Sequence, residues 1–200
     1  MTTLTGWVDY DRPFLPALGR TGRIDYFETR TRLVALNPLH RILQREILPR
    51  DAAGNRIEDS SALLIFGIAI CCSIEALGKF VNGGARGNQR RFEAFLHSYM
   101  NPGFQTEELA GNTYGEMLWR YFRNGLAHGF AVCHGGYEGN ADEPYFRPRD
   151  GVLTINPASL LEDLCCGFDR YLGDLRSASD ADQLYQKFNA VFTSVFVNGE

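Results

Sequence analysis

The 200-residue chain is poor in lysine and has no large excess of charge of either sign. Its only lysines are Lys79 and Lys187; arginine supplies the rest of the positive charge, and the net charge is -4. Neutralising the phosphates of a nucleic acid needs a clustered excess of lysine and arginine. This balance argues against nucleic-acid binding by bulk electrostatics, although a local basic groove remains compatible with it.

Targeting signals and long apolar runs are also absent. The first residues, MTTLTGWVDYDRPFL, do not combine a basic start with an apolar stretch, so we expect no signal peptide. The most apolar segment, residues 62–72, is shorter than the roughly 20 apolar residues that span a bilayer, and we expect it to form a helix buried on most sides. These absences predict a cytoplasmic protein without a membrane partner.

The cysteines do not form a disulfide framework. Their total is odd and includes two adjacent pairs: Cys71, Cys72, Cys133, Cys165 and Cys166. We therefore expect reduced thiols, in agreement with a cytoplasmic setting. The adjacent pairs are expected mostly at small core positions, because free cysteine packs as a small hydrophobic side chain.

The signatures of several enzyme classes are missing. The sequence has no G-x-S-x-G, no G-x-x-x-x-G-K-[ST], no H-E-x-x-H and no strand followed by G-x-G-x-x-G. Cys133 and His134 lie near His128, but no C-x2-C pair completes a tetrahedral zinc set. We therefore expect neither a metal site nor a cofactor.

Apolar residues recur at helical spacing along most of the chain. Helical spacing occurs at residues 26–48 (interrupted at Pro38), 60–81, 88–100, 113–128, 156–175 and 181–197. From these segments we predict a bundle of roughly five helices. Asp150 and Gly151 indicate the turn of a small hairpin at residues 144–156. The predicted fold is all-α: an up-and-down helical bundle of about five helices with a small β-hairpin insertion. It occupies residues 26–200, after an N-terminal arm at residues 1–25.

The N-terminal arm and a glycine-rich loop offer further candidates. The arm has no sustained period, and we expect Trp7, Tyr10 and Phe14 to be its contacts with the body. The loop NGGARGNQRR, residues 82–91, has glycines before a helix and two arginines, which can hold a phosphate. An ordinary helix end is the favoured interpretation, because short glycine motifs match often by chance.

The segment YFRNGLAHGF, residues 121–130, carries the clearest sign of chemistry. Arg123 is followed by the polar Asn124, and His128 comes after four intervening residues, at the end of a predicted amphipathic helix. In this pattern the chain resembles the HEPN superfamily of helical-bundle proteins. Its catalytic members carry an arginine, usually a polar residue next, and a histidine after four to six intervening residues. The resemblance covers the bundle as architecture but only six residues as motif.

The resemblance implies a metal-independent endoribonuclease, often dimeric, in which the motifs of two protomers meet in one cleft. Histidine titrates near neutral pH and can move the proton of the RNA 2'-OH, while arginine stabilises the phosphorane charge. His128 and Arg123 would take these roles, and Asn124 would orient the histidine or the phosphate. Cleavage would leave a 2',3'-cyclic phosphate and a 5'-OH. The implied setting is a toxin or defence effector with RNA as substrate and an antitoxin protein as a further partner.

One departure from the family concerns regulation. In some HEPN toxins a tyrosine lies two residues after the motif histidine and is modified by a partner nucleotidyltransferase. Here that position is Phe130, so the resemblance does not extend to this scheme.

The motif spacing leaves alternatives open. Arg90 and Arg91 satisfy it with His97, although neither is followed by a short polar residue. In a regular helix, Arg123 and His128 lie roughly 140° apart. A working site therefore needs a reaching arginine, a helix distorted near residue 125, or a second protomer.

Without catalysis, the same residues have structural roles. His128 would be a core histidine, and either Arg123 or Arg120 would pair with Glu116. Glu75, within the apolar helix, would be a surface carboxylate; in the catalytic interpretation it is a supporting acid. The alternative function is a catalytically inactive helical module that binds a protein or nucleotide partner. A nucleic-acid binder without catalysis is disfavoured by the acidic balance.

Overall fold

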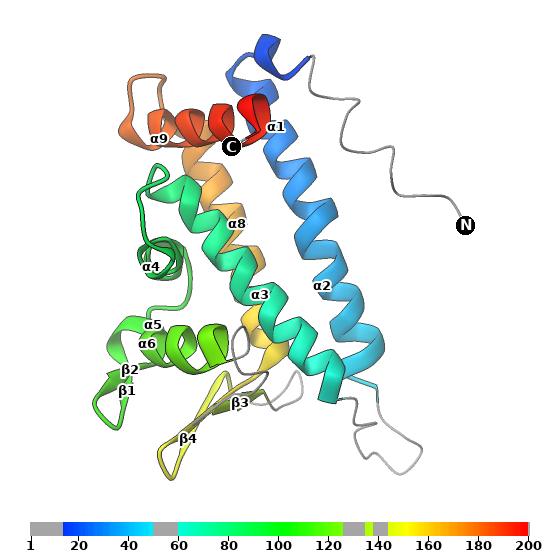
Figure 1. The fold of residues 1–200 in the computed structure, drawn as a ribbon, viewed down its shortest axis with the longest axis vertical. Helices are drawn as coiled ribbons and strands as arrows, with labels where there is room; N and C mark the ends of the chain where they lie inside the picture. The colour runs from blue at the N-terminus through cyan, green and yellow to red at the C-terminus, as the bar shows by residue number, and fades with distance from the viewer. Residues whose placement is uncertain (1–13, 50–59, 126–134, 138–143, 200) are drawn as a thin grey trace.

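The computed structural model describes residues 14–49, 60–125, 135–137 and 144–199. These residues are mainly helical, which confirms the coarse fold class (Figure 1). The helical elements are η2 (Leu15–Ala17), α1 (Arg20–Thr31), η3 (Arg32–Leu36), α2 (Asn37–Ile42), η4 (Leu43–Ile47), α3 (Ser60–Val81), α4 (Asn88–Tyr99), α5 (Gly103–Thr106), α6 (Tyr114–Met117), η5 (Leu118–Asn124), α8 (Pro157–Ser177), α9 (Gln183–Phe192) and η6 (Thr193–Asn198). The strands are β1 (Glu108–Leu109), β2 (Asn112–Thr113), β3 (Gly135–Tyr137), β4 (Phe146–Arg149) and β5 (Val152–Ile155).

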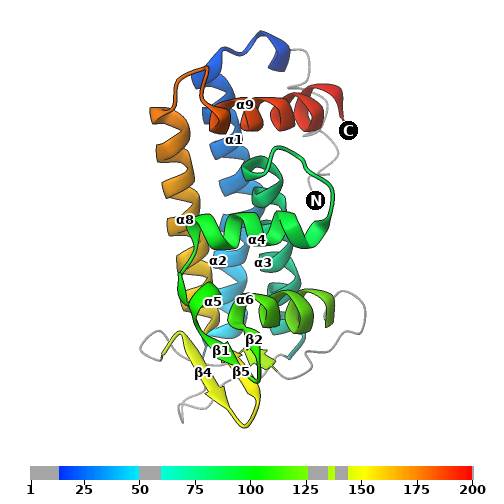
Figure 2. The ribbon, with the colours of Figure 1, turned by 90° about the vertical axis from the view of Figure 1, so that its left-hand side faces the viewer.

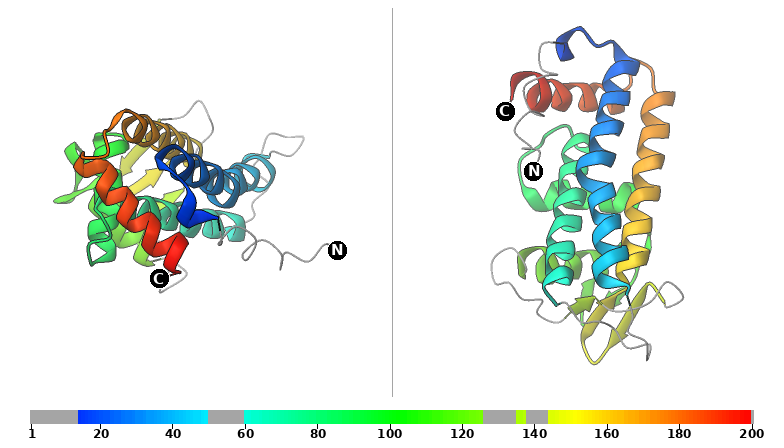
Figure 3. Two further views of the ribbon diagram at one scale, coloured as in Figure 1. Left: turned by 90° about the horizontal axis from the view of Figure 1, so that it is seen from above. Right: turned by 90° about the vertical axis from the view of Figure 1, so that its right-hand side faces the viewer.

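Three long helical rods form the body of the molecule. The first consists of α1, η3, α2 and η4, and the other two are α3 and α8; α1 contacts α8, and α2 contacts α3. Figure 3 shows the three rods side by side, while α9 lies across their upper ends. Figure 2 shows α4 crossing the rods lower down, above α6. In Figure 1 the first rod runs downward, whereas α3 and α8 both run upward, so the three rods do not alternate in direction and the predicted up-and-down order is not confirmed.

The first rod passes through Pro38 without the predicted interruption. Proline has no N–H to donate and usually ends or kinks a helix. Here the wider π-type turn of η3 comes directly before it, with the N–H of Asn37 donating to the carbonyl of Arg32, five residues back. The rod continues as α2, with Pro38 in its first turn, where a missing N–H is tolerated.

The helical body also begins earlier than predicted. Leu15 in η2 is 3% exposed, and Ile24 in α1 is 2% exposed. Both residues belong to the core, so residues 15–25 pack with the body although they were assigned to the N-terminal arm. The apolar signal there was weak because α1 exposes polar residues on most of its surface.

Two glycines let α4 approach both α3 and α8. A Cβ atom at Gly78 of α3 would lie 1.6 Å from the carbonyl oxygen of Arg91, and one at Gly167 of α8 would lie 2.7 Å from that of Tyr99. Only glycine permits these contacts between helix backbones. The face of α4 that its spacing predicts is buried as expected: Phe92, Phe95, Leu96 and Tyr99.

The β structure is more extensive than the predicted hairpin. That hairpin is present as antiparallel β4 and β5, with its turn at Asp150 and Gly151. However, β3 pairs parallel with β5, and β1 and β2 form a second small sheet. The all-α class with a single hairpin is therefore corrected to a mainly helical fold with two small sheets. Strands of two or three residues are too short to show a period in the sequence.

Asp163 of α8 joins the three-stranded sheet region to the helices. Its carboxylate accepts a hydrogen bond from the backbone N–H of Asn101 at 2.8 Å and one from the hydroxyl of Tyr145 at 3.0 Å. Burial raises the pKa of Asp163, while these two hydrogen bonds act in the opposite direction. The start of α8 is fixed by Asn156, whose side chain accepts from the backbone N–H of Ala158 and Ser159, as its N-cap position predicts.

The helix α3 has the bounds that its spacing predicts, but its apolar part extends beyond residues 62–72. Its segment Ala62–Val81 is long and apolar enough to cross a membrane, so the expectation that this region is too short was wrong. A core helix of a soluble protein passes the same test, and α3 packs against α4, α9 and η5. The cytoplasmic location stays a prediction.

We predict that Gly78→Ala lowers the free energy of unfolding by about 3 kcal/mol or more, because the backbone of α4 must move away. Gly173→Ala is the matched control, since Gly173 is exposed on α8 and a Cβ there meets nothing within 4 Å. The free energy of unfolding of this control should rise by up to about 1 kcal/mol, because alanine has the higher helix propensity. Urea unfolding of the two variants measures both, and a Gly78→Ala protein as stable as the parent would contradict the close approach.

Candidate functional site

The motif helix starts at a well-defined cap. Thr113 accepts from the backbone N–H of Glu116 at 3.1 Å, and the Glu116 carboxylate accepts from the N–H of Thr113 at 2.8 Å. This capping box fixes the start of α6, and the sequence interpretation had missed it. The following segment η5 buries Leu118 and Phe122 in the core and packs against α3.

The segment that carries the motif arginine is a π-type helix. η5 covers Leu118–Asn124, and its hydrogen bonds reach five residues back instead of four. A helix distorted near residue 125 was one of the three ways in which the sequence interpretation could bring residues five apart toward one side. The described distortion lies directly before Gly125.

Arg123 projects from η5 onto α3 and meets Glu75 there. The Arg123 Nη2 and Nε atoms lie 2.7 Å and 3.1 Å from the Oε2 atom of Glu75. Both side chains are 16% exposed, so the pair is largely removed from water. A partly buried arginine and carboxylate stabilise each other more than an exposed pair does.

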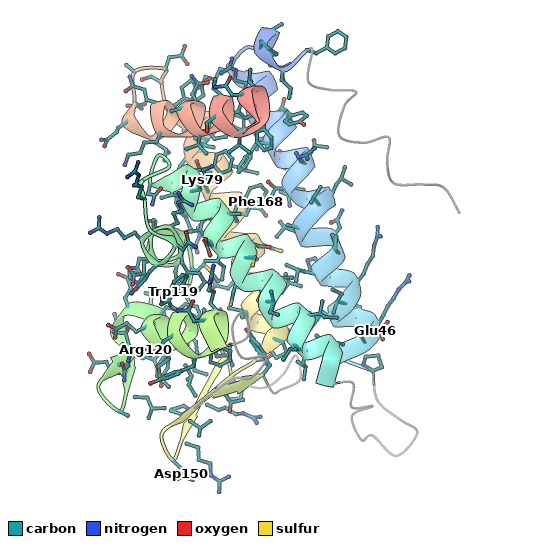
Figure 4. The ribbon with its side chains drawn as sticks, viewed as in Figure 1. Glu46, Lys79, Trp119, Arg120, Asp150 and Phe168 are labelled. Atoms are coloured by element: carbon teal, nitrogen blue, oxygen red, sulfur yellow. The ribbon has the colours of Figure 1, made fainter. Side chains whose placement is uncertain are left out.

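Two further side chains hold the guanidinium of Arg123. Its Nη1 atom donates to the side-chain oxygen of Asn124 at 3.2 Å, and its Cζ atom lies 4.9 Å from the ring centroid of Trp119. Trp119 packs in turn on Phe92 of α4, with ring centroids 5.3 Å apart, and Figure 4 shows it between α4 and η5. These contacts orient a planar cation with several N–H groups.

Without catalysis, the sequence interpretation paired Arg123 or Arg120 with Glu116 and placed Glu75 on the surface. The structure corrects both expectations. Glu116 caps α6, and Arg120 donates to the side-chain oxygen of Asn112 at 3.3 Å. Glu75 is not an exposed surface carboxylate, since it faces Arg123. The available signal was a single acid within a strongly apolar helix, but the sequence did not show which residue paired with it.

The structure brings Arg123 and Asn124 together, whereas His128 lies outside the described residues. Its distance from the arginine, its burial and its partners are therefore not part of the described geometry. His134 and Cys133, once weighed as zinc ligands, also lie outside it. Within the described ranges, no group of three His, Cys, Asp or Glu side chains could hold a metal ion.

The second match to the motif spacing lies on the surface of α4. Arg90 and His97 are exposed, and Arg91 donates through its Nε atom to the carbonyl of Ala85 at 3.0 Å. Arg90 and His97 are seven residues apart, so the two lie about two turns apart along a regular helix. Among the described residues, neither Arg90 nor His97 forms an ion pair like the one between Arg123 and Glu75.

The glycine-rich loop has the geometry of an ordinary helix end. Gly83 and Gly84 adopt φ values of 74° and 79°, and the N–H of Gly84 donates to the carbonyl of Lys79 at 2.8 Å. This left-handed turn closes α3, as the favoured interpretation predicted.

The adjacent cysteines are less buried than expected. Cys71 is fully buried and Cys165 partly so, while Cys72 and Cys166 are exposed, because adjacent helical positions point to different sides. Burial raises the pKa of the Cys71 thiol to about 12 and that of Cys165 to about 11, which makes both poor nucleophiles at neutral pH.

No family model, curated protein or solved structure matches this chain.

We predict that Arg123 and Glu75 are energetically coupled. Because both are largely buried, Arg123→Ala and Glu75→Ala should each lower the free energy of unfolding by about 2–3 kcal/mol. The double variant should lose less than the sum, with a coupling of about 1–2 kcal/mol in a double-mutant cycle measured by urea unfolding.

The matched control is the pair of Arg32 and Asp169, whose side chains are 38% and 56% exposed. It also joins distant parts of the chain, but water screens it, so its coupling should stay below about 1 kcal/mol. Equal coupling in the two cycles would show that the burial of Arg123 and Glu75 has no energetic effect.

Proposed function

We propose that this protein is a HEPN-like, metal-independent endoribonuclease that cleaves RNA by transesterification through the 2'-OH. Arg123 stabilises the negative charge that develops on the phosphate. His128 takes the proton of the 2'-OH as the 2'-oxygen bonds to phosphorus, and a proton is delivered to the 5'-oxygen as its bond to phosphorus breaks. Asn124, which the sequence interpretation assigned to the histidine or the phosphate, orients the arginine. Glu75 keeps the guanidinium in position. The products carry a 2',3'-cyclic phosphate and a 5'-OH.

The observation that carries this proposal is the way in which Arg123 is held. Its contacts with Glu75 and Asn124 use three of the five N–H donors of a guanidinium. Two donors on the terminal nitrogens are not used by any of the described residues. A cation that is fixed before the reaction begins stabilises developing charge without reorganisation.

The chemistry needs no group that the motif lacks. RNA supplies its own nucleophile, and an imidazole that titrates near neutral pH can accept its proton. Arginine matches the geometry of phosphate oxygens better than lysine, because its planar fork donates two parallel hydrogen bonds. The π-type segment η5, which ends at Asn124, supports the helix distortion that is one of the three ways to form the site.

The broader setting follows from the same resemblance. The protein acts in the cytoplasm as a homodimer whose two motifs share one cleft, with an antitoxin protein as a further partner in a toxin or defence system. In this proposal the first rod, α3 and α8 take the place of the helical bundle of that family. Phe130 replaces the modified tyrosine of some family toxins, so that scheme is not included.

One observation favours a second function, a catalytically inactive helical module that binds a protein or nucleotide partner. Glu75 already neutralises the charge of Arg123, which weakens the attraction of this arginine for phosphate. In that case the pair only fastens η5 to α3. The two functions differ in what the motif substitutions do to catalysis.

We expect the purified protein to cleave mixed structured and unstructured RNA in the presence of EDTA. His128→Ala should lower the rate at least about 100-fold, because it removes the general base. Arg123→Lys should lower it by a similar factor, since lysine keeps the charge but loses the fork. Gel analysis of end-labelled RNA measures the rates.

Arg120→Ala is the matched control, because Arg120 is an exposed arginine on the same segment. It should keep full activity, and circular dichroism should show that every variant is folded. If RNA cleavage survives both motif substitutions, the inactive module is favoured. It is also favoured if the parent protein does not cleave RNA.

A further inference from the structure

Basic side chains gather around the loop that joins α3 to α4. They come from the last turn of α3, from the loop, from the beginning of α4 and from α9: Lys79, Arg86, Arg90, Arg91 and Lys187. They include both lysines of the chain. Figure 1 shows the loop between α9 and α4. We call these five residues the basic patch.

Printed contacts of the loop hold the basic patch together. The Nε atom of Arg91 donates to the carbonyl of Ala85 at 3.0 Å, so this side chain turns back onto the loop. A Cβ atom at Gly83 would lie 2.9 Å from the Cγ atom of Lys187, so the stem of this lysine packs directly on the loop. The charges of α4 and α9 are therefore fixed beside one segment of the chain.

No acid pairs with the basic patch among the residues that the structure describes. Glu93, the first acid along α4, accepts instead from the side-chain nitrogen of Gln89 at 2.7 Å. Elsewhere arginines are neutralised, since Arg32 and Arg176 each contact two acids. In a chain of net charge -4, a cluster of positive charge without ion pairs attracts an anionic partner.

The basic patch begins one helical turn from the candidate site. Glu75, which holds Arg123, is four residues before Lys79, so the two lie on one face of α3 about 6 Å apart. Phe92 of α4 packs on Trp119, whose ring lies beneath Arg123. Figure 2 shows the loop and η5 on one side of the molecule, with α4 between them. An anionic chain bound at Arg123 can therefore continue across the basic patch.

We propose that the basic patch binds the phosphate backbone of single-stranded RNA and leads the strand to Arg123. Proteins bind single strands through positively charged surfaces that follow the backbone. The side chains make the contacts, while the backbone of the loop only closes α3. Contacts with phosphates add affinity but read no bases, so we expect little sequence preference from the patch. The choice of RNA as the ligand rests on the proposed function.

Binding is measured apart from cleavage with a fluorescent single-stranded 2'-O-methyl oligonucleotide, which lacks the nucleophile for transesterification. Arg86 and Arg90 are exposed, so replacing both with glutamine should leave the fold intact. In anisotropy titrations at low salt, Arg86→Gln with Arg90→Gln should weaken binding roughly tenfold or more, because two phosphate contacts are lost. The slope of log affinity against log salt concentration should become shallower by about 1.4, since each contact contributes about 0.7.

The matched control is Arg41→Gln with Arg45→Gln, which removes two exposed arginines of the first rod and changes the net charge equally. Figure 4 shows Glu46, the neighbour of Arg45, at the opposite edge of the molecule from Lys79. The control should leave the affinity and the salt slope nearly unchanged. If it weakens binding as much as the patch variant does, net charge alone explains the affinity and the proposal is wrong.

The proposal also fails if the parent protein does not bind the oligonucleotide. Tighter binding of a poly-glutamate peptide of equal charge would assign the basic patch to an acidic protein partner instead. Failure of the nuclease function is a different result. A protein that binds through the patch but cleaves no RNA would refute that function alone, whereas cleavage with binding that ignores the patch would refute this inference alone.

Discussion

The close approach of α4 to both α3 and α8 is the constraint on which the rest of the structure depends. Gly78 and Gly167 remove the two side-chain positions that would keep these helix backbones apart. With α4 seated there, its buried aromatic face fills the space between two of the three long rods. The crossing of helices therefore defines the core, in place of the predicted up-and-down order.

The candidate site follows from this arrangement through a short series of contacts. Phe92 of α4 packs on Trp119, and the ring of Trp119 lies beneath the guanidinium of Arg123. The capping box at Thr113 fixes where the motif helix begins, and the π-type turn brings Arg123 against Glu75. A cation held on three sides is suited to stabilise charge on a phosphate, and it also fastens η5 to α3.

Much of the helical architecture could be predicted from apolar spacing, because long amphipathic segments such as α4 and α8 repeat their pattern over several turns. The continuation of the first rod through Pro38 could not, since it depends on the π-type turn before it. The pairing of Glu75 with Arg123 is a contact across 48 residues, which no local pattern encodes. Within the motif, Arg123 donates a hydrogen bond to the side chain of Asn124, and the place of His128 stays a prediction.

The central claim is that the site activates the 2'-OH of RNA without a metal ion. The most direct measurement is mass spectrometry of the ends formed when the protein, in EDTA, acts on an oligonucleotide and on its 2'-deoxy counterpart. The account predicts cleavage of the RNA alone, with 2',3'-cyclic phosphate and 5'-OH ends. Cleavage of the deoxy strand, or 3'-OH and 5'-phosphate ends, would contradict it.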